Sequence, residues 1–229
     1  MPRYYPVFLD VQGRNCMVFG GNSEGERKVN YLLECGASVT LFSPVAHTTE
    51  GLKSLAAGGK VTWEKRTYRP GDLTGAWLAI VADTSDEASN QQAYDEAREK
   101  NVALNVMDVT PLCTFIAPAI VQRHDVTVAM STSGTSPALA RRLREEMSSP
   151  GCQCLRWADA GPVLAGARKE VRNRQIVVCP EVWQKHMTVA WLELAGLSPQ
   201  RAQSELVAAL AREHCAACAP LGRCQKHHG

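Results

Sequence analysis

The chain of 229 residues is long enough for one large or two small domains with cores of their own. Its composition, with 21% charged and 45% hydrophobic residues, is ordinary for a globular protein, and no apolar run is long enough to span a bilayer. The net charge of +2 is too small to predict a nucleic-acid partner, although the basic excess after residue 150 suits a small anionic ligand. The first ten residues lack the apolar core of a signal peptide, so we expect a cytoplasmic protein without a membrane partner. Nine cysteines, an odd number, favour thiols, some bound to metal, over a disulfide framework.

The first unit, residues 15–44, has the pattern strand, glycine turn, helix, strand. An apolar run precedes Gly20 and Gly21, and Ser23 followed by Glu26 has the spacing of a capping box at a helix start. Exposed backbone amides at such a helix start bind pyrophosphate, helped by the helix dipole. The sequence therefore predicts a dinucleotide-binding turn. The alternative is a strand–helix turn that binds no nucleotide.

This turn departs from the usual G-x-G-x-x-G pattern. It reads Gly20-Gly21-Asn22-Ser23-Glu24-Gly25, so Asn22 stands where the second glycine is expected. We expect the Asn22 side chain to crowd a phosphate that must approach the backbone closely. The next predicted strand, 39–42, is not followed by the Asp or Glu that commonly contacts the adenosine ribose, so the sequence alone does not distinguish NAD from NADP.

Strands and helices continue to alternate as far as Asp108, which predicts a parallel sheet covered by helices on both faces. We expect strands at 61–63, 76–82 and 102–107 and a helix at 87–100. Ligands of such sheets bind at the carboxyl ends of the strands. That edge would bring the glycine turn together with Asp83 and Thr84, which follow one strand, and with Asp108, which follows another.

The pattern changes after residue 114. We predict two strands at 115–121 and 126–130, then a polar turn and a basic helix at 138–147. A polar turn next to arginines suits the binding of ligand carboxylates, whereas the alternative is a linker whose hydroxyls bond their own backbone. The candidate contacts are Ser131, Thr132, Ser133, Gly134, Thr135 and Arg141. After a boundary near residue 150 the chain is mostly helical.

Cysteine and histidine are concentrated in the C-terminal tail, which reads His214-Cys215-x-x-Cys218-x5-Cys224-x-x-His227-His228. This spacing predicts a zinc site with Cys215, Cys218, Cys224 and His227 as ligands. Thiolates also suit an iron–sulfur centre, for which Cys152 or Cys154 would supply the fourth sulfur. The alternative is a thiol-rich tail that binds no metal.

Three segments together resemble the precorrin-2 dehydrogenases, including the corresponding module of sirohaem synthases. They are YPVFLDVQGRNCMVFGGNSEGERKV, NVMDVTPLCTFIAPAIV and AMSTSGTSPALARRLREEM, in unbroken order within residues 4–147. The resemblance implies a homodimer that oxidises precorrin-2, a tetrapyrrole, to sirohydrochlorin with NAD in sirohaem biosynthesis; some members also insert ferrous iron. It also implies an α/β fold. We expect a Rossmann-like NAD-binding domain at 1–113, a small α+β dimerisation and substrate-binding region at 114–150, and a helical C-terminal domain at 151–229.

The resemblance also assigns roles to residues. Asp108 matches the family's active-site aspartate, and we expect it to remove a proton from the reduced macrocycle or to orient it, although Asp before Thr-Pro is also an ordinary turn residue. The candidate cofactor contacts are Gly20, Gly21, Asn22, Ser23, Glu24, Ser43, Pro44, Val45, Asp83 and Thr84. Two other functions stay open: a tetrapyrrole chelatase or carrier that has lost the use of NAD, and a metal-responsive binding protein that acts through the Cys/His tail.

Overall fold

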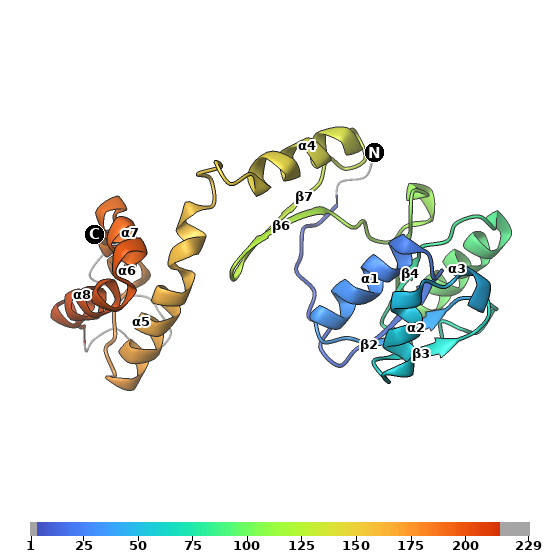
Figure 1. Ribbon diagram of the computed structural model, residues 1–229, viewed down its shortest axis with the longest axis horizontal. Coiled ribbons are helices and arrows are strands. Elements are labelled where there is room, and N and C mark those ends of the chain that lie inside the picture. Colours follow the sequence, from blue (N-terminus) through green and yellow to red (C-terminus); the bar gives the residue numbers. More distant parts are fainter. Residues whose placement is uncertain (1–3, 216–229) are drawn as a thin grey trace. The chain divides into compact units, whose positions relative to one another are not determined.

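The computed structural model describes residues 4–215, and the chain divides into two compact units (Figure 1). The first unit contains the chain as far as Pro118 together with Ser133–Thr135, and the second contains Ala119–Thr132 and everything from Ser136 onward. The division into three parts expected from the sequence stays a prediction. Within the described residues, no helix is both long and apolar enough to cross a membrane.

The first unit is built on a parallel sheet of five strands in the order β3-β2-β1-β4-β5. The strands are β1 (Asn15–Phe19), β2 (Ser38–Phe42), β3 (Val61–Glu64), β4 (Leu78–Val81) and β5 (Ala103–Val106). The helices are α1 (Ser23–Glu34), α2 (Glu50–Ala57) and α3 (Glu87–Lys100), with short 3-10 turns η1 (Val45–His47) and η2 (Thr110–Leu112). The strand order changes direction between β1 and β4, which is where ligands bind in open α/β sheets. The predicted Rossmann-like architecture is confirmed.

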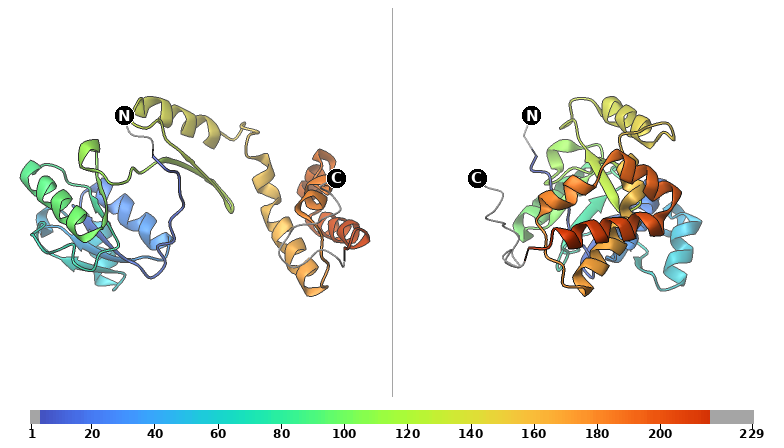
Figure 2. Two further views of the ribbon diagram at one scale, coloured as in Figure 1. Left: turned by 180° about the vertical axis from the view of Figure 1, so that it is seen from behind. Right: turned by 90° about the vertical axis from the view of Figure 1, so that its left-hand side faces the viewer.

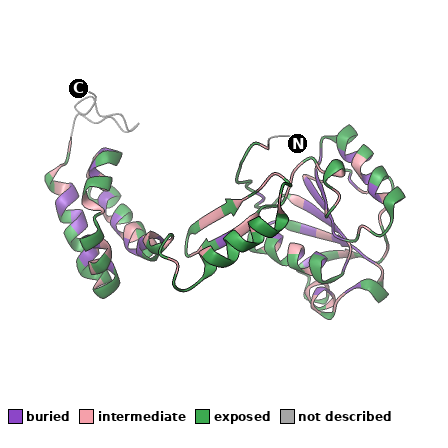
Figure 3. Ribbon diagram, turned by 90° about the horizontal axis from the view of Figure 1, so that it is seen from above, coloured by how far each residue is buried: buried purple, intermediate pink, exposed green. Residues whose placement is uncertain are grey.

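Both faces of this sheet are buried, which explains why its strands read as continuous apolar runs. Val18 of β1 packs with Val29 of α1 and Leu52 of α2 on one face. The next residue, Phe19, packs with Ala97 of α3 on the other face. In Figure 3 the buried positions accordingly follow the sheet and the helix faces turned toward it. The carboxyl edge of the sheet is therefore a rigid support for the turns that follow the strands.

A buried carboxylate ties the loop between β3 and β4 to helix α3. The Tyr68 hydroxyl donates to Glu96 Oε2 over 2.6 Å, and the amides of Gly71 and Leu73 donate to the same carboxylate over 3.0 and 3.1 Å. Burial, and then the hydrogen bond to Glu96, raise the pKa of the Tyr68 hydroxyl, so it remains a donor throughout the neutral range. The loop geometry thus depends on one side chain of α3.

Replacing this carboxylate should weaken the unit measurably. In Glu96→Ala three donors lose their acceptor, so we expect the free energy of unfolding to fall by about 1–3 kcal/mol, as for other unsatisfied buried groups. Urea titration monitored by circular dichroism measures it. Glu99→Ala, at an exposed position of the same helix, is the matched control and should change stability by less than about 0.5 kcal/mol. Equal effects of the two substitutions would contradict the assignment.

The second unit combines a hairpin with a group of helices (Figure 2). Its elements are β6 (Ala119–Arg123), β7 (Val126–Met130), α4 (Pro137–Ser148), η3 (Arg156–Ala160), α5 (Gly161–Asn173), α6 (Pro180–His186), α7 (Val189–Leu197) and α8 (Pro199–Arg212). The two strands are antiparallel. Helix α8 buries Leu206 and Leu210 against Ala167 of α5 and Trp191 of α7. A bidentate ion pair joins the end of β6 to η3, with Arg123 Nε to Asp159 Oδ1 at 2.8 Å and Nη2 to Oδ2 at 2.5 Å.

Two local predictions are wrong. The strand expected from Phe115 begins only at Ala119. The Phe115 amide instead bonds the Leu104 carbonyl of the first unit, and Pro118 has no amide proton for a strand ladder. Helix α1 is capped by Asn22 and not by Ser23, because Asn22 Oδ1 accepts from the third amide of the helix.

Candidate functional site

The glycine turn between β1 and α1 has no room for side chains at three positions. Gly20 has φ +110°, and a Cβ there would lie 2.6 Å from the Asp83 amide nitrogen. A Cβ on Gly21 would lie 2.5 Å from Ser43 Oγ, and a Cβ on Gly25 would overlap the Gly20 carbonyl oxygen. The start of α1 consequently lies directly against the ends of the neighbouring strands.

Asn22, the residue that departs from the glycine pattern, is held by the protein itself. Its Oδ1 accepts from the Gly25 amide over 2.9 Å, and its Nδ2 donates to the Ala82 carbonyl over 3.3 Å. The amides of Asn22, Ser23 and Glu24 donate to no acceptor within residues 4–215. These amides can therefore receive an anion at the positive end of the helix dipole.

The Glu24 carboxylate at this helix start forms an ion pair with Arg27. Arg27 Nη2 lies 2.5 Å from Glu24 Oε2, and both side chains are exposed. The guanidinium thus offsets a carboxylate that would otherwise repel a phosphate.

A pocket opens at the carboxyl ends of β1, β2 and β4 and brings together Gly20, Pro44 and Asp83, which the sequence predicted as cofactor contacts. Its wall is aromatic, because the rings of Phe19 and Phe42 stack with centroids 4.7 Å apart. Other lining residues come from the loop between β3 and β4 and from the start of α3, namely Thr67, Tyr68, Asp86, Ser89 and Asn90. Sequence patterns did not predict that Thr67, Tyr68, Ser89 and Asn90 line the pocket; the aromatic residue that ends β2, Phe42, was an available signal.

Other residues predicted to contact the cofactor do not line the pocket and lie in the turns that follow the strands. Ser43 is buried, where its Oγ accepts from the Thr48 hydroxyl over 2.9 Å and its carbonyl accepts from Trp63 Nε1 over 2.9 Å. Val45 is exposed beside it. The Thr84 carbonyl accepts from the side-chain Nδ2 of Asn90 over 3.0 Å, which fixes the turn after β4. Ser43 and Thr84 therefore shape the strand ends through hydrogen bonds inside the protein.

Asp108 lies in the turn after β5, exposed, with φ +60°. A positive φ is uncommon for a residue other than glycine, and aspartate and asparagine adopt it more readily than most. The alternative role as a turn cap is not observed, since Val109 is the N-cap of η2 and no side chain caps it. The Asp108 carboxylate accepts no hydrogen bond from the described part of the chain, so it is available to a ligand.

Hydrogen bonds behind Asp108 hold this turn in place. The Val106 amide donates to Cys113 Sγ over 3.3 Å, and Asn105 Nδ2 donates to the Phe115 carbonyl over 3.1 Å. Burial raises the pKa of the Cys113 thiol, so the sulfur stays protonated and serves as a structural hydrogen-bonding group. The turn that carries Asp108 is thus fixed by hydrogen bonds of neighbouring residues.

Lys28 of α1 is a further candidate, because its ammonium group interacts electrostatically with the Asp108 carboxylate. Burial lowers the pKa of Lys28, the charge of Arg27 lowers it further, and the charge of Asp108 acts in the opposite direction. A half-buried cation next to the candidate catalytic aspartate suits an anionic substrate. No sequence pattern links residues this far apart.

The polar turn before α4 partly matches the alternative of a linker whose hydroxyls bond their own backbone. Thr132 Oγ1 donates to the Ser136 carbonyl and accepts from its amide, and Ser136 Oγ accepts from Leu139 N at the start of the helix. Gly134, with φ +84°, and Thr135 are exposed. Farther along the helix, Arg141 pairs with Glu145 over 2.9 Å at an exposed position. The Thr132 hydroxyl is therefore used within the turn, and the exposed residues are the better candidates for ligand contact.

Of the predicted metal ligands, Cys215 is described, whereas Cys218, Cys224 and His227 lie outside the described residues. Between residues 4 and 215, no three or more His, Cys, Asp or Glu side chains are grouped to hold a metal ion.

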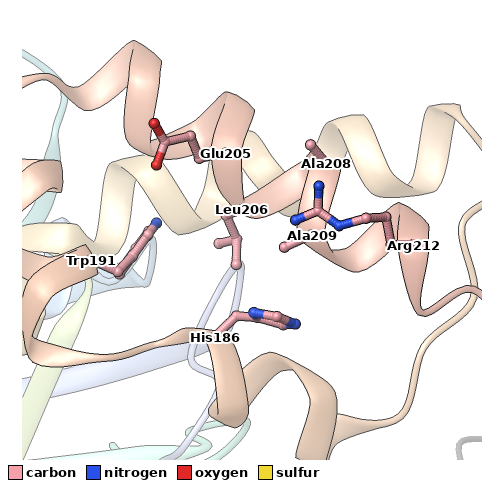
Figure 4. A pocket seen from close by; sticks show the side chains of 7 residues that line it. All are labelled: His186, Trp191, Glu205, Leu206, Ala208, Ala209 and Arg212. Carbon is pink, nitrogen blue, oxygen red and sulfur yellow. The ribbon is translucent and has the colours of Figure 1, made fainter.

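A second cavity, of about 360 Å³, lies within the helices of the second unit (Figure 4). Trp191 and Leu206 line it together with the more polar His186, Glu205 and Arg212. No residue predicted from the sequence lies there.

Comparisons with known proteins show what the chain is similar to. Residues 7–119 match the family described as "Putative NAD(P)-binding". The chain is 40% identical over 147 residues to the sirohaem synthase of Pseudoalteromonas atlantica, a match covering 64% of this chain and 31% of that protein. It is 31% identical over 223 residues to the sirohaem synthase of Neisseria meningitidis serogroup B, covering 88% and 44%. A solved structure, "SirC, precorrin-2 dehydrogenase", has the same fold, with a TM-score of 0.73 over 89% of this chain and 98% of that one at 21% identity.

The parallel sheet, the glycine turn and the family match together define the first unit as a Rossmann-like NAD(P)-binding domain. The chain is similar to sirohaem synthases over part of their length, and it has the fold of a solved precorrin-2 dehydrogenase. It spans less than half the length of the sirohaem synthases that it matches.

Proposed function

We propose that the protein oxidises precorrin-2 to sirohydrochlorin with NAD as the hydride acceptor, a step of sirohaem biosynthesis. The observation that carries this proposal is the glycine turn, where three unbonded amides meet the positive end of α1 inside an NAD(P)-binding domain. Relatives named sirohaem synthase support the choice of pathway.

The residues present fit the cofactor. The amides of Asn22, Ser23 and Glu24 suit its pyrophosphate, and the space that the glycines leave open lets a phosphate approach the backbone. The aromatic pocket beside Gly20 suits the adenosine half. NAD supplies the site with an acceptor for hydride.

The acidic lining of this pocket favours NAD over NADP. Asp83 and Asp86 both line it. Hydrogen bonds from the backbone and the hydroxyl of Ser89 lower the pKa of Asp86, so it remains ionised at neutral pH. Two carboxylates would repel the additional phosphate of NADP.

Asp108 is the proton acceptor in this proposal. Its carboxylate is exposed and accepts no hydrogen bond from the described residues, so it can take a proton from the reduced macrocycle as hydride leaves. The same carboxylate could remove pyrrole protons during ferrous iron insertion, which would add a chelatase activity with iron as substrate. In this proposal Lys28 and the exposed Gly134 and Thr135, all of the first unit, are candidate contacts for the carboxylates of the tetrapyrrole.

A homodimer and a cytoplasmic location belong to the same proposal. Leu139 and Leu143 of α4 and Val126 of the hairpin are exposed apolar residues in the region predicted to dimerise, 114–150. Exposed thiols such as Cys35 and Cys154 suit a reducing compartment. We also propose a zinc or iron–sulfur centre in the C-terminal tail, since its thiol spacing suits both.

Titration with NAD, followed by an assay with precorrin-2, tests the function. We expect NAD to bind the purified protein and NADH to form only when precorrin-2 is added, with absorbance changing toward that of sirohydrochlorin. If neither NAD nor NADP binds at millimolar concentration, the oxidation proposal fails and a chelatase or carrier takes its place. If NAD binds but no NADH forms with precorrin-2, and added ligands change only the metal content of the tail, a metal-responsive protein is favoured.

A further inference from the structure

Two cysteines lie on either side of a single residue in the turn that joins α4 to η3. Cys152 is partly exposed, Cys154 is exposed, and neither forms a disulfide. The Cys152 amide donates to the Ser149 carbonyl over 2.9 Å, and the Arg156 amide donates to the Gln153 carbonyl over 3.2 Å. Backbone hydrogen bonds therefore hold the turn on both sides of the pair, while the sulfur atoms are accessible to solvent.

The spacing of Cys152 and Cys154 suits a covalent bond between their sulfur atoms. Two residues of chain span at most about 7 Å between Cα atoms. Disulfides join Cα atoms that lie about 4.4–6.8 Å apart. The two thiols are also hydrogen-bonded to each other, so the side chains already lie together. The pair can therefore close a disulfide within its own turn.

Their surroundings make the two thiols unequal. Hydrogen bonds from the thiol and then from the amide of Cys154 lower the pKa of Cys152, and the charge of Arg123 lowers it further. Burial and the charge of Glu146 act in the opposite direction. The hydrogen bond between the thiols raises the pKa of Cys154. Because the thiolate is the nucleophile, Cys152 is the sulfur that attacks first.

Three other cysteines within residues 4–215 lack these features. Burial raises the pKa of Cys16 to about 11, and it also raises the pKa of Cys35 and of Cys113. Cys35 is nevertheless exposed. Exposure alone thus does not distinguish the pair; an accessible thiolate with a second thiol beside it does.

We propose that Cys152 and Cys154 form a redox-active dithiol that is oxidised by low-molecular-weight disulfides. The observation that carries the proposal is the contact between two accessible sulfur atoms on one turn. Exposed disulfides are the labile ones, so the oxidised pair would be reduced again by thiols. The site lies wholly within the second unit and depends on neither NAD nor a metal ion.

The reaction is an exchange in two steps. The Cys152 thiolate attacks one sulfur of the reagent, forms a mixed disulfide and releases one thiolate of the reagent. Cys154 then loses its proton, attacks the Cys152 sulfur and releases the second thiolate. The two thiols of the protein give up two protons and two electrons in total, and the reagent disulfide takes them up as two thiols.

Mass spectrometry of the full-length protein tests the proposal. The reduced protein is treated with glutathione disulfide, and the remaining thiols are blocked with N-ethylmaleimide before digestion with trypsin. Cleavage after Arg144 and Arg156 puts both cysteines in the peptide 145–156, which contains no other cysteine. We expect this peptide to carry two labels before treatment. After treatment it should carry none and weigh two hydrogens less than the unlabelled peptide, and dithiothreitol should restore both labels.

The same digest contains an internal control. The peptide 29–53 has Cys35 as its single cysteine. Cys35 is exposed, but the carboxylate of Glu34 adds to burial in raising its pKa. We expect it to keep most of its label over the time in which the peptide 145–156 loses both.

Two single substitutions test the order of attack. In Cys154→Ser the mixed disulfide cannot resolve, so Cys152 should retain one glutathione. In Cys152→Ser we expect Cys154 to take up glutathione at least about threefold more slowly, because Arg123 favours the thiolate at position 152.

Three outcomes overturn the proposal: two labels on the peptide 145–156 after treatment, equal rates in the two variants, or equal loss of label from the peptide 29–53. None of these measurements uses NAD or precorrin-2. The redox site and the proposed oxidation of precorrin-2 therefore fail separately.

Discussion

Asp108→Asn is expected to lower turnover of precorrin-2 by about 10²-fold or more while leaving NAD affinity unchanged. The loss of an acid–base group typically has this magnitude. Asparagine keeps the size of the side chain and, like aspartate, tolerates the positive φ of this position, so the turn should not move. Steady-state kinetics with saturating NAD measures the effect, and titration of the variant with NAD measures cofactor affinity.

The control for this substitution is another exposed aspartate of the first unit. Asp95→Asn on α3 removes the same charge at a position remote from the strand ends, and it should keep wild-type turnover. If Asp108→Asn also retains near-normal turnover, Asp108 is a turn residue and the proton must go elsewhere. A variant that loses NAD binding together with turnover would point to a displaced loop instead of a missing base.

Local signals explain why so much of the sheet was predictable. The helix expected at 87–100 has those bounds, since Asp86 caps its first turn and Asn101, with φ 55°, ends it. Alternating strands and helices admit few arrangements other than a parallel sheet, and in such a sheet the strand ends meet. Gly20, Pro44 and Asp83 come together for that reason.

Contacts between distant segments were not predictable from the same signals. The loop between β3 and β4 lines the pocket because Glu96 of α3 accepts a hydrogen bond from Tyr68 of that loop. No periodic sequence pattern predicts that pair of residues. The packing of Cys179 against Cys215 likewise depends on how α6 and α8 are joined. Asn22 is a different case. Its residue type suggested crowding, whereas its hydrogen bonds to Gly25 and Ala82 determine its position.

The glycine that follows Asn22 by three residues allows the strongest test of cofactor binding. A Cβ in Gly25→Ala would overlap the carbonyl oxygen of Gly20 and lie 3.0 Å from its carbonyl carbon. Both atoms belong to the backbone, so the clash cannot be relieved by rotating a side chain. The turn and the first turn of α1 must separate, which moves the three free amides. We expect the Kd for NAD to rise at least about tenfold, or about 1.4 kcal/mol.

Calorimetric titration with NAD and thermal unfolding of the same sample distinguish loss of the site from loss of the fold. Gly161→Ala is the matched control, since it adds a methyl group at the start of α5 where a Cβ meets nothing within 4 Å. Alanine favours a helix over glycine, so propensity alone would leave both variants at least as stable as the wild type. A weaker NAD complex in Gly25→Ala, with the control unchanged, therefore reports the clash at the turn. Wild-type NAD affinity in Gly25→Ala would mean that the cofactor does not depend on this turn, and the amides of Asn22, Ser23 and Glu24 would lose their assigned role.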